Sequence, residues 1–131
     1  MEKTMHERAY KFFESFCAAM KSGVLENIME HYAVSEDTIQ ILSNGQIIVG
    51  YENINREYSL FLEEVEMLDF QVPMFRTVEM DDHVLMILQL HGMARVKKSR
   101  VKLPYRGSGS ILAKMLDGEF KMICEHFTLR D

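Results

Sequence analysis

The sequence lacks tryptophan altogether and has only two prolines and two cysteines in 131 residues. Cys17 and Cys124 belong to no CxxC pair and no cysteine–histidine cluster, so the sequence offers no zinc site. No apolar run approaches the roughly 20 residues that a membrane-spanning helix needs. We therefore expect no metal, no cofactor and no membrane insertion. We expect a disulfide between the two cysteines only in an oxidising compartment.

Positive charge is also scarce, because 15 lysines and arginines face 20 aspartates and glutamates and leave a net charge of -5. A chain with this balance is not expected to bind nucleic acid or an anionic membrane. The segment 95–106 departs from the average, since it is basic and contains no acid. We interpret it as the solvated tip of a hairpin, with phosphate or an acidic partner as the alternative. The first residues, 1–11, are charged and do not resemble a secretory signal, so we expect a cytoplasmic protein.

Methionine, in contrast, is abundant, with 11 residues. Its flexible side chain fills irregular apolar space, which fits either a methionine-rich core or a pocket that adapts to an apolar ligand. No linker, repeat or low-complexity tract divides the chain. The length and the absence of a linker predict a single domain that spans residues 1–131.

Hydrophobic periodicity and turn residues predict the order ααββαββββ. Helices are expected at 3–21, 24–31 and 51–64. Short strands are expected at 37–42 and 46–49, around a type I′ turn at Ser43-Asn44-Gly45. Long strands are expected at 65–79, 83–96, 100–116 and 119–129. Long strands joined by short turns are antiparallel neighbours, so we predict an α+β, cystatin-like fold. In it, a curved, mostly antiparallel sheet forms a cone around the long N-terminal helix.

Three segments support this order by resemblance. Gly23–Tyr32 (GVLENIMEHY) resembles the second helix of the nuclear-transport-factor-2-like superfamily, also called SnoaL-like or ketosteroid-isomerase-like, and residues 50–54 (GYENI) resemble the start of its third helix. Residues 117–128 (DGEFKMICEHFT) are similar to its closing strand, with Phe120 and Cys124 in place of the usual tryptophan and histidine. The resemblance implies the fold. It does not imply one function, because this fold hosts enzymes, binding proteins and assembly domains.

The resemblance also implies where isomerase residues would stand. The catalytic tyrosine position falls near Phe16, the base near Gln40 or Ile41, and the late-strand acid at 108–110. None of these positions carries the required residue type, so we do not expect isomerase chemistry by that route. Whether the chain is an enzyme at all stays open.

Strand alternation predicts one buried acid. In the last strand, Ile123, Glu125 and Phe127 share a face that the resemblance turns toward the inside of the cone. A carboxyl group among apolar neighbours has a raised pKa and can act as an acid or a base, which makes Glu125 the candidate catalytic residue. The alternative is a structural ion pair with an arginine such as Arg76.

The sequence thus predicts a small-molecule binding protein whose ligand is apolar or aromatic. The predicted site lies inside the cone and includes Phe16, Tyr58, Glu125 and Phe127, and the guest is expected to carry a neutral or positively charged hydrogen-bonding group. The alternative is a non-catalytic dimerisation or assembly module. In either case we expect a homodimer, because the outer sheet face is half apolar and needs cover. That face carries Ile87, Gln89, His91 and Met93.

Overall fold

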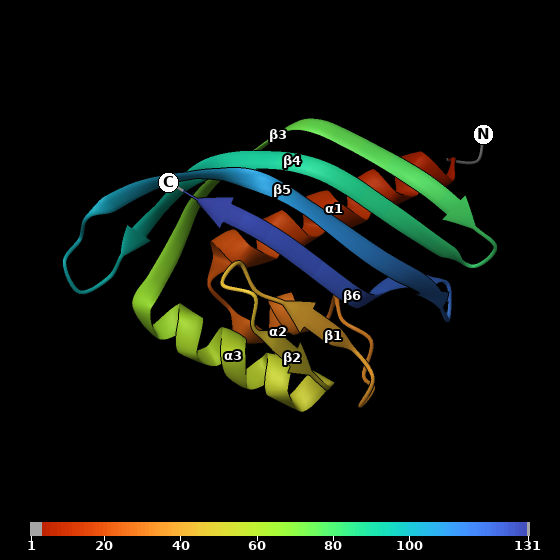
Figure 1. Cartoon of the computed structure of the whole chain (residues 1–131), viewed down its shortest axis with the longest axis horizontal. Helices are drawn as coiled ribbons and strands as arrows, with labels where there is room; N and C mark the ends of the chain where they lie inside the picture. Colours follow the sequence, from red (N-terminus) through yellow and green to blue (C-terminus); the bar gives the residue numbers. More distant parts are fainter. Residues whose placement is uncertain (1–3, 131) are drawn as a thin grey trace.

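The computed structural model describes residues 4–130, in which a long N-terminal helix packs under a curved six-stranded sheet (Figure 1). The helices are α1 (Met5–Ser22), α2 (Leu25–Met29) and α3 (Tyr51–Glu64). The strands are β1 (Ile39–Ile41), β2 (Ile47–Val49), β3 (Val65–Met80), β4 (His83–Val96), β5 (Lys102–Leu116) and β6 (Glu119–Arg130). This order and the mostly antiparallel α+β architecture confirm the prediction.

Helix α1 has a defined signal at each end. The Thr4 side chain accepts a hydrogen bond from the backbone N–H of Glu7, which caps the first turn. Gly23 ends the helix in the left-handed conformation, with φ of 70°. Position 3, where the sequence predicts the helix to begin, lies outside the described residues. The apolar stripe of α1 faces the concave side of the sheet, and its buried members are Ala9, Phe13, Phe16, Cys17, Ala19 and Met20.

The sheet has the strand order β2-β1-β6-β5-β4-β3. Neighbours pair antiparallel except β1 and β6, which run parallel with Gln40 opposite Glu125. Figure 1 shows the four long strands arching over α1, while the β1–β2 hairpin, α2 and α3 lie below the open end of the arch. Gln40 and Glu125, which are far apart in the sequence, are therefore brought together by a non-local strand pairing.

A bulge in β6 changes which side chains face inward. The pairing with β5 shifts between Leu112 and Ala113, which stand opposite Cys124 and Met122, so Ile123 is the extra residue. Met122 is fully buried and Glu125 is 2% exposed, although three positions separate them. The expectation that Ile123 shares the inward face with Glu125 is therefore wrong, and Met122 is buried instead. Glu125 does face the interior, because the bulge resets the alternation.

One predicted turn also differs. At Ser43-Asn44-Gly45 only Gly45 has a positive φ, of 89°, whereas a type I′ turn needs two such residues. Leu42 N–H donates to the Gln46 carbonyl at 2.9 Å, which closes a three-residue loop instead. The turn between β5 and β6 does have two positive φ angles, 51° at Asp117 and 84° at Gly118, as type I′ requires.

Both cysteines are free thiols, with Cys17 buried and Cys124 half-buried. No helix between residues 4 and 130 is both long and apolar enough to cross a bilayer. In the same part of the chain, no three histidine, cysteine, aspartate or glutamate side chains gather as a metal site.

Candidate functional site

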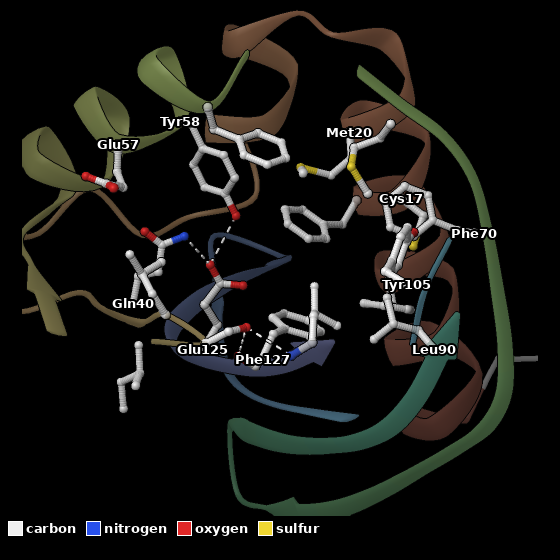
Figure 2. Close-up of a pocket in the computed structure, with 18 of the residues that line it drawn as sticks. Cys17, Met20, Gln40, Glu57, Tyr58, Phe70, Leu90, Tyr105, Glu125 and Phe127 are labelled. Atoms are coloured by element: carbon white, nitrogen blue, oxygen red, sulfur yellow. Dashed lines mark hydrogen bonds between the residues drawn. The ribbon is translucent and has the colours of Figure 1, made fainter. Parts of the chain in front are cut away.

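A cavity of about 580 Å³ lies between α1, α3 and the concave face of the sheet (Figure 2). Its size falls in the range of roughly 300–1,000 Å³ that is typical of small-molecule sites. The helices and the sheet contribute a mainly aromatic and aliphatic wall. Its apolar members include Phe13, Phe16, Met20, Phe61, Met67, Phe70, Leu90, Phe127 and Leu129.

The four residues of the predicted site come from three different elements and line this one cavity. Phe16 lies on α1, Tyr58 on α3, and Glu125 and Phe127 on β6. That they bind a ligand stays a prediction. Tyr51, at the start of α3, packs against the hydrophobic core and does not line the cavity.

Glu125 is held at the cavity wall by three donors that meet on one oxygen. Its Oε1 accepts hydrogen bonds from Gln40 Nε2 at 2.8 Å, from Tyr58 Oη at 3.1 Å and from Tyr32 Oη. Its other oxygen, Oε2, is buried and has no partner within residues 4–130. In Figure 2 the carboxyl group points into the cavity between Tyr58 and Phe127. The protein thus supplies hydrogen-bond donors to Oε1, whereas Oε2 has a free acceptor position at the cavity.

The expected partner Arg76 takes no part in this network. Arg76 stands in register with Ile87, whose side chain is 36% exposed on the outer face of the sheet. The partners of Glu125 are therefore neutral phenols and an amide, and the proposed ion pair is wrong.

Burial raises the pKa of Glu125, and the bonds from Tyr32, Gln40 and Tyr58 oppose this rise without cancelling it. Burial, followed by the charge of Glu125, also raises the pKa of both phenols, so they remain protonated donors. Their hydroxyl oxygens are 2.6 Å apart, so the two phenols and the carboxyl group form one compact buried cluster.

Sequence reasoning missed Tyr32 as a site residue and named Gln40 only as the place of an absent base. Gln40 meets Glu125 because β1 pairs with β6, a contact between segments far apart in the chain. Tyr32 is placed by a parallel bridge to Met122, supported by a 2.9 Å bond from Ala33 N–H to the Met122 carbonyl. The only available signal for Tyr32 was its place at the end of the segment 23–32 that resembles the second helix of the superfamily.

Two glycines make room for the aromatic wall. A Cβ atom at Gly109 would lie 2.4 Å from the ring of Phe127, so the ring rests directly on the strand. A Cβ atom at Gly92 would lie 2.0 Å from the Asp69 carbonyl oxygen and 2.6 Å from Tyr105 Oη. Tyr105 uses this space to reach across β4 and donate to Asp69 at 2.9 Å. Both rings are fixed by backbone rather than by other mobile side chains.

Known structures share this architecture at low sequence identity. A ketosteroid isomerase-like protein from Erwinia carotovora atroseptica has a TM-score of 0.80 at 14% identity, covering 96% of this chain and 98% of its own. An NTF2-like protein from Streptomyces avermitilis, provisionally described as a dehydratase, has a TM-score of 0.83 at 13% identity, with 93% of both chains covered. The chain has the NTF2-like fold.

The NTF2-like fold is what these proteins share. A further neighbour, from Exiguobacterium sibiricum, is provisionally described as an association domain of a calcium/calmodulin-dependent kinase and has a TM-score of 0.76 at 12% identity. It covers 100% of this chain and 98% of its own. No protein-family model and no curated protein matches the sequence.

Within the NTF2-like fold, this chain places its buried acid differently from the isomerase arrangement that the resemblance implies. Ser108 is exposed and Ser110 is half-buried, so neither supplies a group to the cavity. Gln40, at the expected place of the base, instead donates to Glu125. The carboxyl chemistry of the cavity therefore rests on β6.

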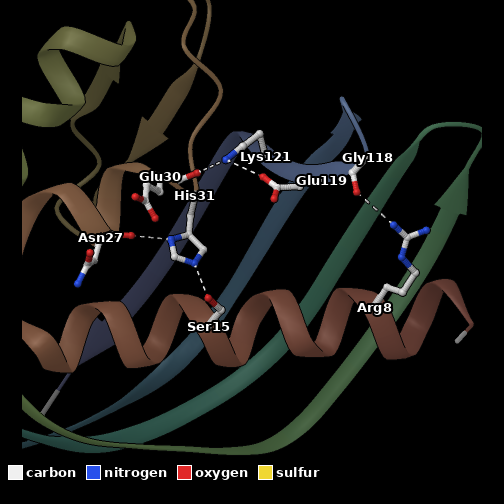
Figure 3. Close-up of polar contacts among 8 residues, drawn as sticks. All are labelled: Arg8, Ser15, Asn27, Glu30, His31, Gly118, Glu119 and Lys121. Carbon is white, nitrogen blue, oxygen red and sulfur yellow. Dashed lines mark hydrogen bonds and ion pairs between the residues drawn. The ribbon is translucent and has the colours of Figure 1, made fainter.

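A second polar cluster ties α2 to α1 (Figure 3). His31 Nδ1 lies 2.9 Å from the Asn27 carbonyl, which can only accept, so Nδ1 carries the proton. His31 Nε2 then accepts from Ser15 Oγ at 2.9 Å. Burial lowers the pKa of His31, which keeps the ring neutral and this arrangement stable. The cluster lies outside the cavity and serves to hold the two helices together.

Proposed function

We propose that the chain binds a small, largely apolar molecule in the cavity beside Glu125. The observation that supports this best is a buried carboxyl group with one unpartnered oxygen in the wall of an otherwise aromatic and aliphatic cavity. Mostly apolar concave sites with a few convergent polar groups are the usual form of small-molecule sites. The unpartnered oxygen orients the ligand, and the rings supply most of the contact area.

Acid–base chemistry is a further possibility of the same site. A carboxyl group whose pKa is raised by burial exchanges a proton closer to neutral pH than an exposed one. Tyr32 and Tyr58 stabilise the ionised form through Oε1, which leaves Oε2 to meet a substrate atom. Binding does not require this step, so binding is tested first.

Titration with Nile red, a neutral apolar dye, tests the binding proposal. We expect saturable, blue-shifted fluorescence with one dye per chain. The double variant Cys17→Phe/Leu90→Phe adds two rings to the cavity wall and should weaken Nile red binding at least tenfold. Val24→Phe is the matched control, because Val24 is 46% exposed and does not line the cavity.

The wild-type titration is decisive even if the filled variant does not fold. A chain that shows no saturable dye binding contradicts the proposal. Thermal denaturation provides a second readout, because any ligand at a hundred times its Kd should raise the free energy of unfolding by about 2.7 kcal/mol.

We also propose that two copies pair through the outer face of the sheet. Three apolar side chains on this face are exposed, with Val78 at 51%, Met80 at 44% and Ile87 at 36%. Exposed apolar groups that share a face are typical of interfaces, and a two-fold axis covers each with its counterpart. The neighbour described as an association domain supports this proposal by analogy.

Sedimentation velocity tests the pairing. We expect a dimer for the wild type and a dissociation constant at least tenfold higher for Ile87→Glu, because the substitution buries two carboxylates in an apolar contact. Val34→Glu is the control, since Val34 is 81% exposed and lies outside the sheet. A monomeric wild type at micromolar concentration would rule out this interface.

A further inference from the structure

The charged side chains of the cavity all have the same sign. Among the described residues that line it, these are Glu57, Glu64 and Glu125, and no lysine, arginine or histidine accompanies them. Glu57 is half-buried and directly precedes Tyr58 on α3, and Glu64 is exposed at the end of the same helix. The charged residues that line the cavity are therefore all acidic, and they come from α3 and β6.

The hydrogen-bonding groups at the buried end point to the same kind of ligand. The amide of Gln40 and the hydroxyls of Tyr32 and Tyr58 are already directed at Glu125 Oε1. The two buried atoms left without partners within residues 4–130 are Glu125 Oε2 and Gln40 Oε1, and both are acceptors. The ligand must supply the donors, and a protonated amine supplies up to three.

The aromatic rings of the cavity wall suit a cation as well. Phe16, Tyr58, Tyr105 and Phe127 line the same cavity, and ring faces attract organic cations more strongly when water is excluded. A carboxylate ligand would meet three carboxylates and no free donor. An ammonium would instead neutralise Glu125 in surroundings where an isolated charge is costly.

We propose that the ligand is an organic cation, an aromatic or aliphatic body with one protonated amine that donates to Glu125 Oε2. This inference rests on the proposed function and specifies the class of molecule bound. It also implies proton release, because the cation favours the ionised carboxyl group. The other titratable groups that face Glu125 or line the cavity are Tyr32, Tyr58, Tyr105, Cys17, Glu57 and Glu64.

Three probes with one body and different head groups test the proposal by calorimetry at pH 7. They are 4-phenylbutylamine, 4-phenylbutan-1-ol and 4-phenylbutyrate. We expect the amine to bind at least tenfold more tightly than the alcohol and the butyrate to bind weakest. The affinity of the amine should rise with pH through the pKa of Glu125, with proton release that falls to zero above it.

Glu125→Gln keeps the shape of the side chain and removes its charge. The substitution should weaken binding of the amine at least tenfold and change the affinity for the alcohol less than threefold. Glu63→Gln is the matched control, because Glu63 is exposed on α3 and does not line the cavity. It should leave the ratio of the amine affinity to the alcohol affinity unchanged.

The outcomes separate this inference from the function on which it rests. If Nile red binds and the amine has no advantage over the alcohol, or does not bind, the cation preference is wrong and the binding function stands. The same holds if Glu125→Gln leaves the ratio of amine to alcohol unchanged. If neither Nile red nor any of the three probes binds, the proposed function itself fails.

Discussion

Replacing Gly92 with alanine should lower the free energy of unfolding by about 3 kcal/mol, near the upper end of what overpacking usually costs. The added methyl group would lie 2.0 Å from the Asp69 carbonyl oxygen and 2.6 Å from Tyr105 Oη. The first contact is with backbone, which cannot rotate away, so β3 must separate from β4. The second displaces Tyr105 from its 2.9 Å hydrogen bond to Asp69. Urea denaturation measures the loss.

The same substitution should also weaken Nile red binding, because Tyr105 is part of the cavity wall. Ser108→Ala is the control, since Ser108 is exposed on the neighbouring strand β5 and its replacement creates no backbone contact. A Gly92→Ala protein within about 0.5 kcal/mol of the wild type would show that the close packing of Tyr105 over β4 is wrong.

Replacing Glu125 should lower the free energy of unfolding by a similar amount when the new side chain cannot accept hydrogen bonds. A replacement that keeps the shape and an acceptor oxygen should have a small effect. Glu125→Leu leaves Gln40 Nε2 and one tyrosine hydroxyl without an acceptor in a buried place. Buried donors without partners cost about 1–3 kcal/mol each, so we expect a loss of roughly 3 kcal/mol. Glu125→Gln retains an acceptor oxygen and should lose about 1 kcal/mol or less.

The two variants should also remove a pH dependence. Because burial raises the pKa of Glu125 above its ordinary value of 4.5, the folded chain holds this proton more tightly than the unfolded chain. The resulting stability is fully present below about pH 4.5 and is lost as the pH rises through the folded pKa. Denaturation of Glu125→Gln across this range should show a flatter profile. Parallel profiles for the variant and the wild type would mean that Glu125 does not titrate with a raised pKa.

Elements with a regular period could be predicted from the sequence. The apolar spacing of α1 and the alternation of β4 gave the right faces, because Val84, Met86, Leu88 and Leu90 are indeed buried. The β6 strand could not be predicted in this way. A period of two cannot bury both Met122 and Glu125, so any unbroken alternation places one of them wrongly.

The partners of Glu125 were unpredictable for a different reason. Gln40 and Tyr32 reach it through the β1–β6 pairing and the bridge at Met122, and neither contact leaves a local pattern in the sequence. Arg76, the partner that charge alone suggested, stands on the other face of the sheet. Charge complementarity suggests that a buried acid needs a hydrogen-bond donor. Which residues donate to it depends on how distant strands pair.

The bulge at Ile123 sets the register of the second half of β6. An unbroken alternation from the buried Met122 would turn Cys124 and His126 inward and Glu125 outward. With the bulge, Glu125 is buried and accepts hydrogen bonds from three side chains. The three hydrogen bonds to Glu125 therefore form only in the bulged pairing, and they favour it over an unbroken one. The donors that orient the carboxyl group are therefore also contacts that fix the register of the strand.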